Sequence, residues 1–229
     1  MDFNNKTLHI FELFGLEVWI TQTIVSTWII MAALIILAVV VRIMLRRFKT
    51  VPSGFQNVIE LAVEAFGNIV NNAAGENYAY LGNWFFSVFA FILVSNLSGM
   101  VGLRPPTADF ATTFALALAT FFIVQVMGIK QRRGKYLKSF FQPIFLFFPL
   151  NLLGELARPI SLSFRLFGNV LAGLILTGLL YSLPIYLRFI IPAAAHAIFD
   201  VFFGALQTYV FCILSLSFIG SAVKSPGEA

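Results

Sequence analysis

Hydrophobic residues follow one another along this chain in stretches that are long enough to cross a lipid bilayer. An α-helix rises 1.5 Å per residue, so about 20 predominantly apolar residues span the hydrocarbon core. Short segments that contain Pro, Gly, Lys, Arg or Asp separate the stretches. The pattern therefore predicts membrane-spanning helices at residues 20–45, 84–101, 110–129, 140–183 and 192–223.

Residues 56–74 follow a different pattern, in which apolar and polar positions alternate with helical periodicity. Leu61, Ala65 and Ile69 fall at helical spacing, and Glu and Asn residues fill the opposite side. This segment is too polar to span, so we predict an amphipathic helix at the membrane surface; a helix packed against a partner protein is the alternative. The predicted fold class is thus all-α and integral to the membrane, with about five spans plus one amphipathic helix in a single domain over residues 1–229.

The stretch at residues 140–187 is too long for one upright crossing. It carries only three charged residues, and its first half is interrupted by Pro143, Pro149 and Pro159. We therefore expect its surplus length to lie as a shallow or re-entrant piece, or to be taken up by a strong tilt.

The distribution of Lys and Arg predicts the orientation of the chain. The segments 42–49 and 130–138 are richer in basic residues than the segments 102–109 and 184–191. Basic loops favour the cytoplasmic side, so the first two are expected there, with the N-terminus (1–19) outside and the C-terminus inside. This topology requires the long fourth stretch to make one net crossing; two crossings, which would leave the C-terminus outside, are the alternative.

Composition supports a membrane location and excludes several functions. Hydrophobic residues make up 59% of the chain and charged residues 11%, against about a quarter in a soluble domain. The net charge of +5 comes from basic residues at the ends of apolar runs, which favours membrane anchoring over nucleic-acid binding. With a single cysteine, Cys212, no intrachain disulfide or cysteine metal cluster can form.

Other signatures of catalysis and targeting are missing from the sequence. We find no phosphate-binding glycine loop, metal-ligand spacing or nucleophile triad, so we expect no nucleotide site, metal or cofactor on this chain. The N-terminal segment has no basic start, no small-residue cleavage site and no arginine, unlike signal and transit peptides. The absence of a transit peptide favours the plasma membrane of a bacterium, with a thylakoid membrane as the alternative.

Arg165 is the main candidate for chemistry. It lies within an apolar segment, and arginine stays protonated at any relevant pH. Inserting such a charge into hydrocarbon costs roughly 2.5 kcal/mol or more, which a chain tolerates when the charge faces a partner or a wet cavity. An arginine near a helix end that reaches toward the interface is the alternative, and Arg158 fits that description better.

Polar residues near Arg165 could line a groove with it. Asn169 and Ser161 lie four residues after and before it, on the same helical face. Ser163 and Glu155 lie further toward the predicted cytoplasmic end. Singly, serine and asparagine in membrane helices often form helix–helix hydrogen bonds, which is the alternative.

The last predicted span carries a second polar stripe. His196, Asp200 and Gln207 are spaced by four and seven residues, so they share one face of an α-helix. A buried carboxylate beside a histidine can take up and release protons. We predict a proton relay there, with a structural histidine–aspartate pair as the alternative, and Gln207 within reach of an arginine on a facing helix.

The segment ARPISLSFRLFGN, at residues 157–169, closely resembles the signature of the a subunit of F-type ATP synthases. The segments SNLSGMVGLRPPTAD at 95–109 and AIFDVFFGALQTYVF at 197–211 also resemble that family in order and spacing. The resemblance implies that Arg165 is the essential stator charge and that Gln207 is the family's glutamine. It further implies that the last two long helices form a tilted hairpin against a rotating ring of c subunits.

The resemblance also implies a mechanism and partners. An ion, expected to be H+ although Na+ remains open, would enter from outside past Asp200, His196 and Asn96. It would neutralise a carboxylate on the c ring and leave near Glu155, Ser161 and Ser163, with Arg165, Asn169 and Gln207 between the two half-channels. The implied partners are the c ring, the peripheral-stalk b subunits, other ATP synthase subunits and membrane lipid.

Two positions depart from the family pattern. Relatives often carry an acid or histidine nine residues after the arginine, where this chain has Leu174, and a histidine or acid seven residues before the glutamine, where it has Asp200. His196 is the candidate to compensate. A secondary transporter with Arg165 binding an anion, and a structural scaffold, remain the alternative functions.

Overall fold

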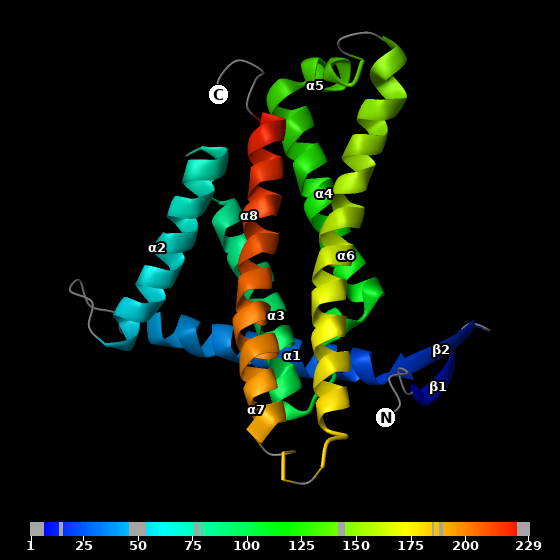
Figure 1. Ribbon diagram of the computed structural model, residues 1–229. Coiled ribbons are helices and arrows are strands. Elements are labelled where there is room, and N and C mark those ends of the chain that lie inside the picture. Colours follow the sequence, from blue (N-terminus) through cyan, green and yellow to red (C-terminus); the bar gives the residue numbers. More distant parts are fainter. Residues whose placement is uncertain are drawn as a thin grey trace. The chain divides into compact units, whose positions relative to one another are not determined.

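The computed structural model describes residues 7–13, 16–45, 54–75, 78, 80–141, 145–184, 186–187 and 190–223 (Figure 1). Helices dominate this part of the chain. The longer ones are α1 (Gln22–Leu45), α2 (Phe55–Ala74), α3 (Leu81–Leu97), α4 (Phe110–Arg132), α6 (Phe148–Leu180) and α8 (Gly204–Val223). The shorter helical elements are η2 (Ser98–Val101), η3 (Pro106–Ala108), α5 (Gly134–Ser139), η4 (Phe145–Phe147), α7 (Ile190–His196) and η5 (Ala197–Phe203).

Five helical segments among the described residues are long and apolar enough to cross a membrane, which confirms the predicted number of spans. They are Gln22–Met44, Leu81–Val101, Phe110–Arg132, Phe148–Leu180 and Ile190–Val223. The predicted class, an integral membrane protein built from helices, is therefore confirmed. The two prolines of the last-but-one span do not prevent this: Pro149 stands in the first turn of α6, where its missing N–H is not needed, and Pro159 lies inside the helix.

Helix α6 explains the surplus length of the fourth apolar stretch. It contains 33 residues, so it is about 50 Å long at 1.5 Å per residue, well beyond a 30 Å hydrocarbon core. The preceding residues form the separate short elements α5 and η4. Pro143, which was expected to interrupt the stretch, lies outside the described residues.

The last span is not a uniform α-helix. Its first part is α7, its last part is α8, and η5 between them is π-helical (Ala197–Phe203). A π-helical stretch changes the angle between successive side chains, and such stretches are frequent at functional sites. Asp200 lies inside it.

The N-terminal part of the chain contains two strands that were not predicted and one helix, α2, that was. Strands β1 (Thr7–Leu13) and β2 (Leu16–Thr21) pair antiparallel, with Leu13 opposite Leu16, in the segment expected only to lie outside the membrane. Helix α2 covers the segment predicted to be amphipathic: Glu60, Glu64 and Asn68 on the predicted polar side are exposed, whereas Val70 is fully buried. The ring of Phe66 meets the rings of Phe86 and Phe89 on α3 edge-on.

The helices belong to two compact units. The first contains residues 1–49, 90–112 and 166–208, and the second contains residues 50–89, 113–165 and 209–229. In the second unit the core includes Phe85, Phe211 and Ile219, each fully buried. In the first unit Phe110 and Phe167 pack edge to face, with their ring centroids 5.8 Å apart.

Candidate functional site

A cavity of about 330 Å³ lies within the first compact unit. It is enclosed by the C-terminal half of α6, the α7–η5 segment, the start of α8 and the loop after η2. Its polar lining comes from Gln22, Asn96, Arg104, Asn169, His196 and Asp200, together with Tyr181 and Gln207. Polar side chains in a cavity between apolar spanning helices can bind the water that an ion path through a membrane requires.

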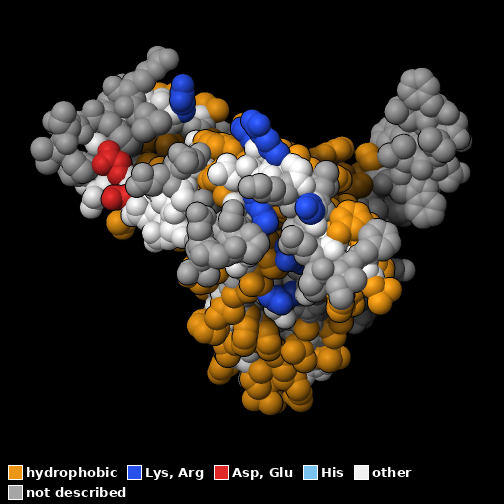
Figure 2. Space-filling view, turned by 90° about the horizontal axis from the view of Figure 1, so that it is seen from above, with side chains coloured by type: hydrophobic (Ala, Val, Ile, Leu, Met, Phe, Trp, Pro, Cys, Tyr) orange, Lys and Arg blue, Asp and Glu red, His pale blue; other side chains and the backbone are white. Residues whose placement is uncertain are grey.

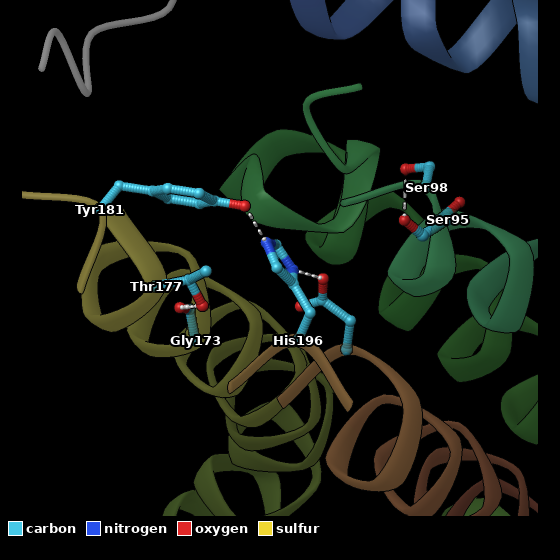
Figure 3. A network of polar contacts seen from close by, with 7 residues as sticks. Ser95, Ser98, Gly173, Thr177, Tyr181 and His196 are labelled. Carbon is cyan, nitrogen blue, oxygen red and sulfur yellow. Dashed lines mark hydrogen bonds and ion pairs between the residues drawn. The ribbon is translucent and has the colours of Figure 1, made fainter. Parts of the chain in front are cut away.

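Three of these side chains form a hydrogen-bonded row, which Figure 3 shows from close by. Nδ1 of His196 lies 2.6 Å from Oδ2 of Asp200, one turn along the same helix. Nε2 of the same ring lies 3.0 Å from the hydroxyl of Tyr181, at the end of α6. The predicted histidine–aspartate pair is therefore present, and it is extended by a tyrosine that the sequence pattern did not single out.

Asn169 and Gln207 join α6 to α8. Nδ2 of Asn169 donates to Oε1 of Gln207 over 2.6 Å. Gln207 is only 3% exposed, and its Nε2 has no hydrogen-bond partner among the described residues. The sequence pattern predicted that Gln207 reaches an arginine, whereas here its carbonyl oxygen is held by Asn169.

Asn96 is the most fully bonded of the candidates. Its Nδ2 donates to the carbonyl oxygen of Gly204 and to the hydroxyl of Thr208, and its Oδ1 accepts from the hydroxyl of Thr107. Its Cβ also lies close to Gly204, where an added methyl group would approach it to 3.1 Å. Asn96 lines the cavity but also ties η3 and α8 to the end of α3.

Arg165 lies in the middle of α6, four residues before Asn169 in an uninterrupted helix. Its side chain is exposed, and the described residues provide it with no hydrogen bond or ion pair. Phe164 beside it is 56% exposed. A permanent charge on an exposed stretch of a spanning helix is costly in lipid, so such a residue pairs with a countercharge or faces water.

The serines before Arg165 point in different directions. Ser161 is exposed, while Ser163 is fully buried and its hydroxyl donates to the backbone oxygen of Ile160. Two residues are separated by about 200° around an α-helix, because each residue turns by about 100°. The structure therefore leaves only Ser161 on the outward side.

Glu155 belongs to a polar cluster of the second unit. Its Oε1 pairs with Nη1 of Arg158 at 2.8 Å, and its Oε2 accepts from Nε2 of Gln125 at 3.3 Å. The hydroxyl of Tyr136 donates to Oε1 of the same glutamine, and the guanidinium of Arg158 lies 5.2 Å from the ring centroid of Phe218. Burial, and then the Glu155 carboxylate, raise the pKa of Tyr136, so its hydroxyl stays protonated as a donor.

Basic residues gather at one end of the second unit. Lys130 and Arg132 occupy the last turn of α4, and Lys138 the last turn of α5. Figure 2 looks onto this face, where lysine and arginine side chains gather amid hydrophobic ones, while acidic side chains lie over α2. Among the described residues, no three His, Cys, Asp or Glu side chains lie together as metal ligands would.

The sequence reasoning identified His196, Asp200, Asn169 and Gln207, and all four line the one cavity. It missed Tyr181 because tyrosine is common at membrane interfaces and its partner lies 15 residues away across a turn. Leu174 also lines the cavity and offers no group that could hold a proton.

Comparison with known proteins places the chain among subunits of one enzyme. The family described as "ATP synthase A chain" matches residues 24–220. "ATP synthase subunit a" of Moorella thermoacetica is 36% identical over 223 residues, covering 95% of this chain and 97% of that protein. "ATP synthase subunit a 2" of a Bradyrhizobium species is 36% identical over 209 residues, covering 90% of each chain.

A third relative carries an ion in its name. "ATP synthase subunit a, sodium ion specific" of Propionigenium modestum is 33% identical over 227 residues, covering 89% of this chain and 74% of that protein. These matches extend over nearly the whole chain and agree with the five apolar spans. The chain therefore belongs to the ATP synthase A chain family, the multi-pass membrane subunit that works with the other ATP synthase subunits to translocate ions in rotary ATP synthesis.

Proposed function

We propose that this chain carries H+ through two offset half-channels at its interface with a rotating c ring. The observation that carries the proposal is Arg165: a permanent cation, exposed in the middle of a long apolar helix and without a partner among the described residues. Such a charge needs a countercharge from outside the chain, because its burial in lipid alone costs roughly 2.5–3.5 kcal/mol. A carboxylate on a ring of c subunits meets that need.

The cavity of the first unit is the proposed inlet. It is lined by Asp200 and His196, which can exchange protons, and by Asn96 and Asn169, which can hold water. A proton that reaches the ring carboxylate neutralises it, and a neutral carboxyl can rotate through lipid where a charged one cannot. Asn169 and Gln207, which bond to each other across α6 and α8, keep the two helices in register beside the ring.

Arg165 separates inlet from outlet in this proposal. Its charge attracts the ionised carboxylate, favours release of the proton and blocks a direct leak. Each elementary charge that crosses gains about 2.3 kcal/mol per 100 mV of membrane potential, and rotation transmits this free energy to the catalytic head.

The outlet is proposed to follow the outward side of α6 past Ser161 and Glu155. Glu155 is partly exposed, and Arg158 and Gln125 hold its carboxylate in place, so it offers a fixed polar group along this side of α6. Ser163 was expected in the same groove; since it is buried against its own helix, we assign it to helix packing.

The basic residues in the last turns of α4 and α5 support a cytoplasmic position for the ends of these two helices. We propose that the peripheral-stalk b subunits and the c ring are the partners of this subunit, in the cell membrane of a bacterium. The N-terminus would then lie outside and the C-terminus inside.

A decisive experiment replaces Arg165 by alanine in the assembled enzyme. ATP-driven proton pumping into inverted membrane vesicles, followed by quenching of a pH-sensitive dye, is expected to disappear. Lys130→Ala is the matched control, because Lys130 is an exposed cation in the last turn of α4 that belongs to neither proposed half-channel, so pumping should stay largely intact. Near-normal pumping by Arg165→Ala would refute the proposal.

Na+ is the second candidate for the transported ion, because the relative from Propionigenium modestum is named as sodium ion specific. Pumping in the presence and absence of Na+ distinguishes the two ions. The secondary-transporter alternative gains no support from the comparisons, which match subunit a over most of the chain.

A further inference from the structure

Tyr181 directly follows α6, and its hydroxyl lies against the ring of His196, whose other nitrogen meets Asp200 (Figure 3). An ionised carboxylate can only accept hydrogen bonds, so Nδ1 of His196 is its donor. In a neutral imidazole the other nitrogen, Nε2, is then an acceptor, and the Tyr181 hydroxyl is the donor that faces it. The two contacts thus select one tautomer of His196.

We propose that Tyr181, His196 and Asp200 form a single proton relay, in which Tyr181 fixes the tautomer of His196 and Gly99 makes room for the Asp200 carboxylate. This proposal rests on the proposed function, since it makes the cavity of the first unit the inlet. It adds Tyr181 to the proton path of this chain, and it adds Gly99 as the residue that leaves room for the Asp200 carboxylate.

The proton count along the row is balanced. The Tyr181 hydroxyl gives its proton to Nε2 of His196 while Nδ1 gives its proton to Oδ2 of Asp200. A hydronium ion in the cavity gives a proton to the tyrosine oxygen in the same movement and is left as neutral water. One proton has then entered from the cavity and one has been bound by Asp200, while the imidazole remains neutral with its proton moved from one nitrogen to the other.

Few ionisable groups face this row. Among the residues that line the cavity, the ionisable ones are Arg104, Tyr181, His196 and Asp200. Arg104 comes from the loop between η2 and η3, and α1 contributes only the neutral Gln22. Leu174 lines the same cavity but cannot bind a proton. The side chains in this cavity that can bind one therefore belong to the row.

The missing side chain at Gly99 is a second, independent observation about the position of the Asp200 carboxylate. A Cβ atom at position 99 would stand 2.9 Å from Oδ2 of Asp200, the same oxygen that accepts from His196. An approach under 3.0 Å forces one of the two groups to move. A side chain at 99 would therefore displace either the Asp200 carboxylate or the backbone at position 99, and glycine avoids that conflict.

The test measures ATP-driven proton pumping by the assembled enzyme in inverted vesicles, over a range of pH. Tyr181→Phe keeps the ring and removes only the hydroxyl. We expect pumping to fall about tenfold, as for the loss of one hydrogen bond in the rate-determining barrier. The pH of half-maximal pumping should also shift, which a purely structural role of Tyr181 would not cause. Tyr186→Phe, at a residue that is 89% exposed, is the matched control.

Gly99→Ala tests the second half of the proposal, with Gly134→Ala as control because a Cβ there would meet nothing within 4 Å. Gly99→Ala should lower pumping and change its pH profile as Tyr181→Phe does. If Gly99→Ala fails to assemble, Tyr181→Phe alone decides. Unchanged rate and pH profile in Tyr181→Phe, while Arg165→Ala is inactive, would overturn the relay and leave the proposed function standing. Pumping by Arg165→Ala would overturn the function itself.

Discussion

Nδ2 of Asn169 donates to Oε1 of Gln207 over 2.6 Å, and this bond joins the long helices α6 and α8. Gln207 is nearly fully buried, and among the described residues Asn169 is the partner of its carbonyl oxygen. A side-chain amide between spanning helices needs another polar group as its hydrogen-bond partner. The bond between Asn169 and Gln207 therefore fixes the register of α6 against α8.

This bond predicts an energetic coupling between the two residues. A double-mutant cycle of Asn169→Ala and Gln207→Leu should give a coupling free energy of about 0.6 kcal/mol, and at most about 1.7 kcal/mol, as for hydrogen bonds between other membrane helices. Equilibrium unfolding in mixed micelles measures the free energy of unfolding of each variant. If the two single effects simply add, the bond does not hold the helices together.

The close approach of Tyr136 to Gly128 predicts a local packing defect. A Cβ at position 128 would lie 2.7 Å from Cε2 of Tyr136, whose side chain is buried. Gly128→Ala should therefore lower the free energy of unfolding by about 1–3 kcal/mol, the usual cost of overpacking. It should also separate the Tyr136 hydroxyl from Gln125.

The matched control for this packing prediction is Gly134→Ala, because its added methyl group meets no other atom within 4 Å. Thermal unfolding in detergent compares the two variants directly. Equal midpoint temperatures of unfolding in Gly128→Ala and Gly134→Ala would show that the Tyr136 ring moves aside at no cost in stability.

The proposed orientation predicts which residues can be labelled from each side of the membrane. In a Cys212→Ala background, Lys138→Cys should react with a membrane-impermeant maleimide only in inverted vesicles. Val101→Cys, at a residue that is 79% exposed, should react only in right-side-out vesicles. Cys212 must be removed because it is the sole cysteine, although it is buried. The reverse labelling pattern would invert the topology.

Much of the architecture follows from the sequence, because each spanning helix satisfies its own backbone hydrogen bonds and needs only length and apolar character. The five spans and the amphipathic helix could therefore be read from local pattern. The spacing of His196 and Asp200 also predicted their contact, since four residues make one helical turn and both belong to one segment.

The positions of side chains that come from different segments could not be read in this way. The bond between Asn169 and Gln207, the contact of Tyr181 with His196, and the room that Gly99 leaves for Asp200 each join residues far apart along the chain. The β1–β2 hairpin and the π-helical turn around Asp200 likewise left no clear periodic signal.

By itself, the sequence determined where the chain crosses the membrane and that one arginine, Arg165, stands within an apolar stretch, because both depend only on the order of apolar and charged residues. Only the tertiary structure decided that Ser163 is buried while Ser161 is exposed, and that Tyr181 completes the row with His196 and Asp200. Burial and hydrogen bonding across a turn are set by how helices pack, and packing depends on contacts that no local pattern encodes.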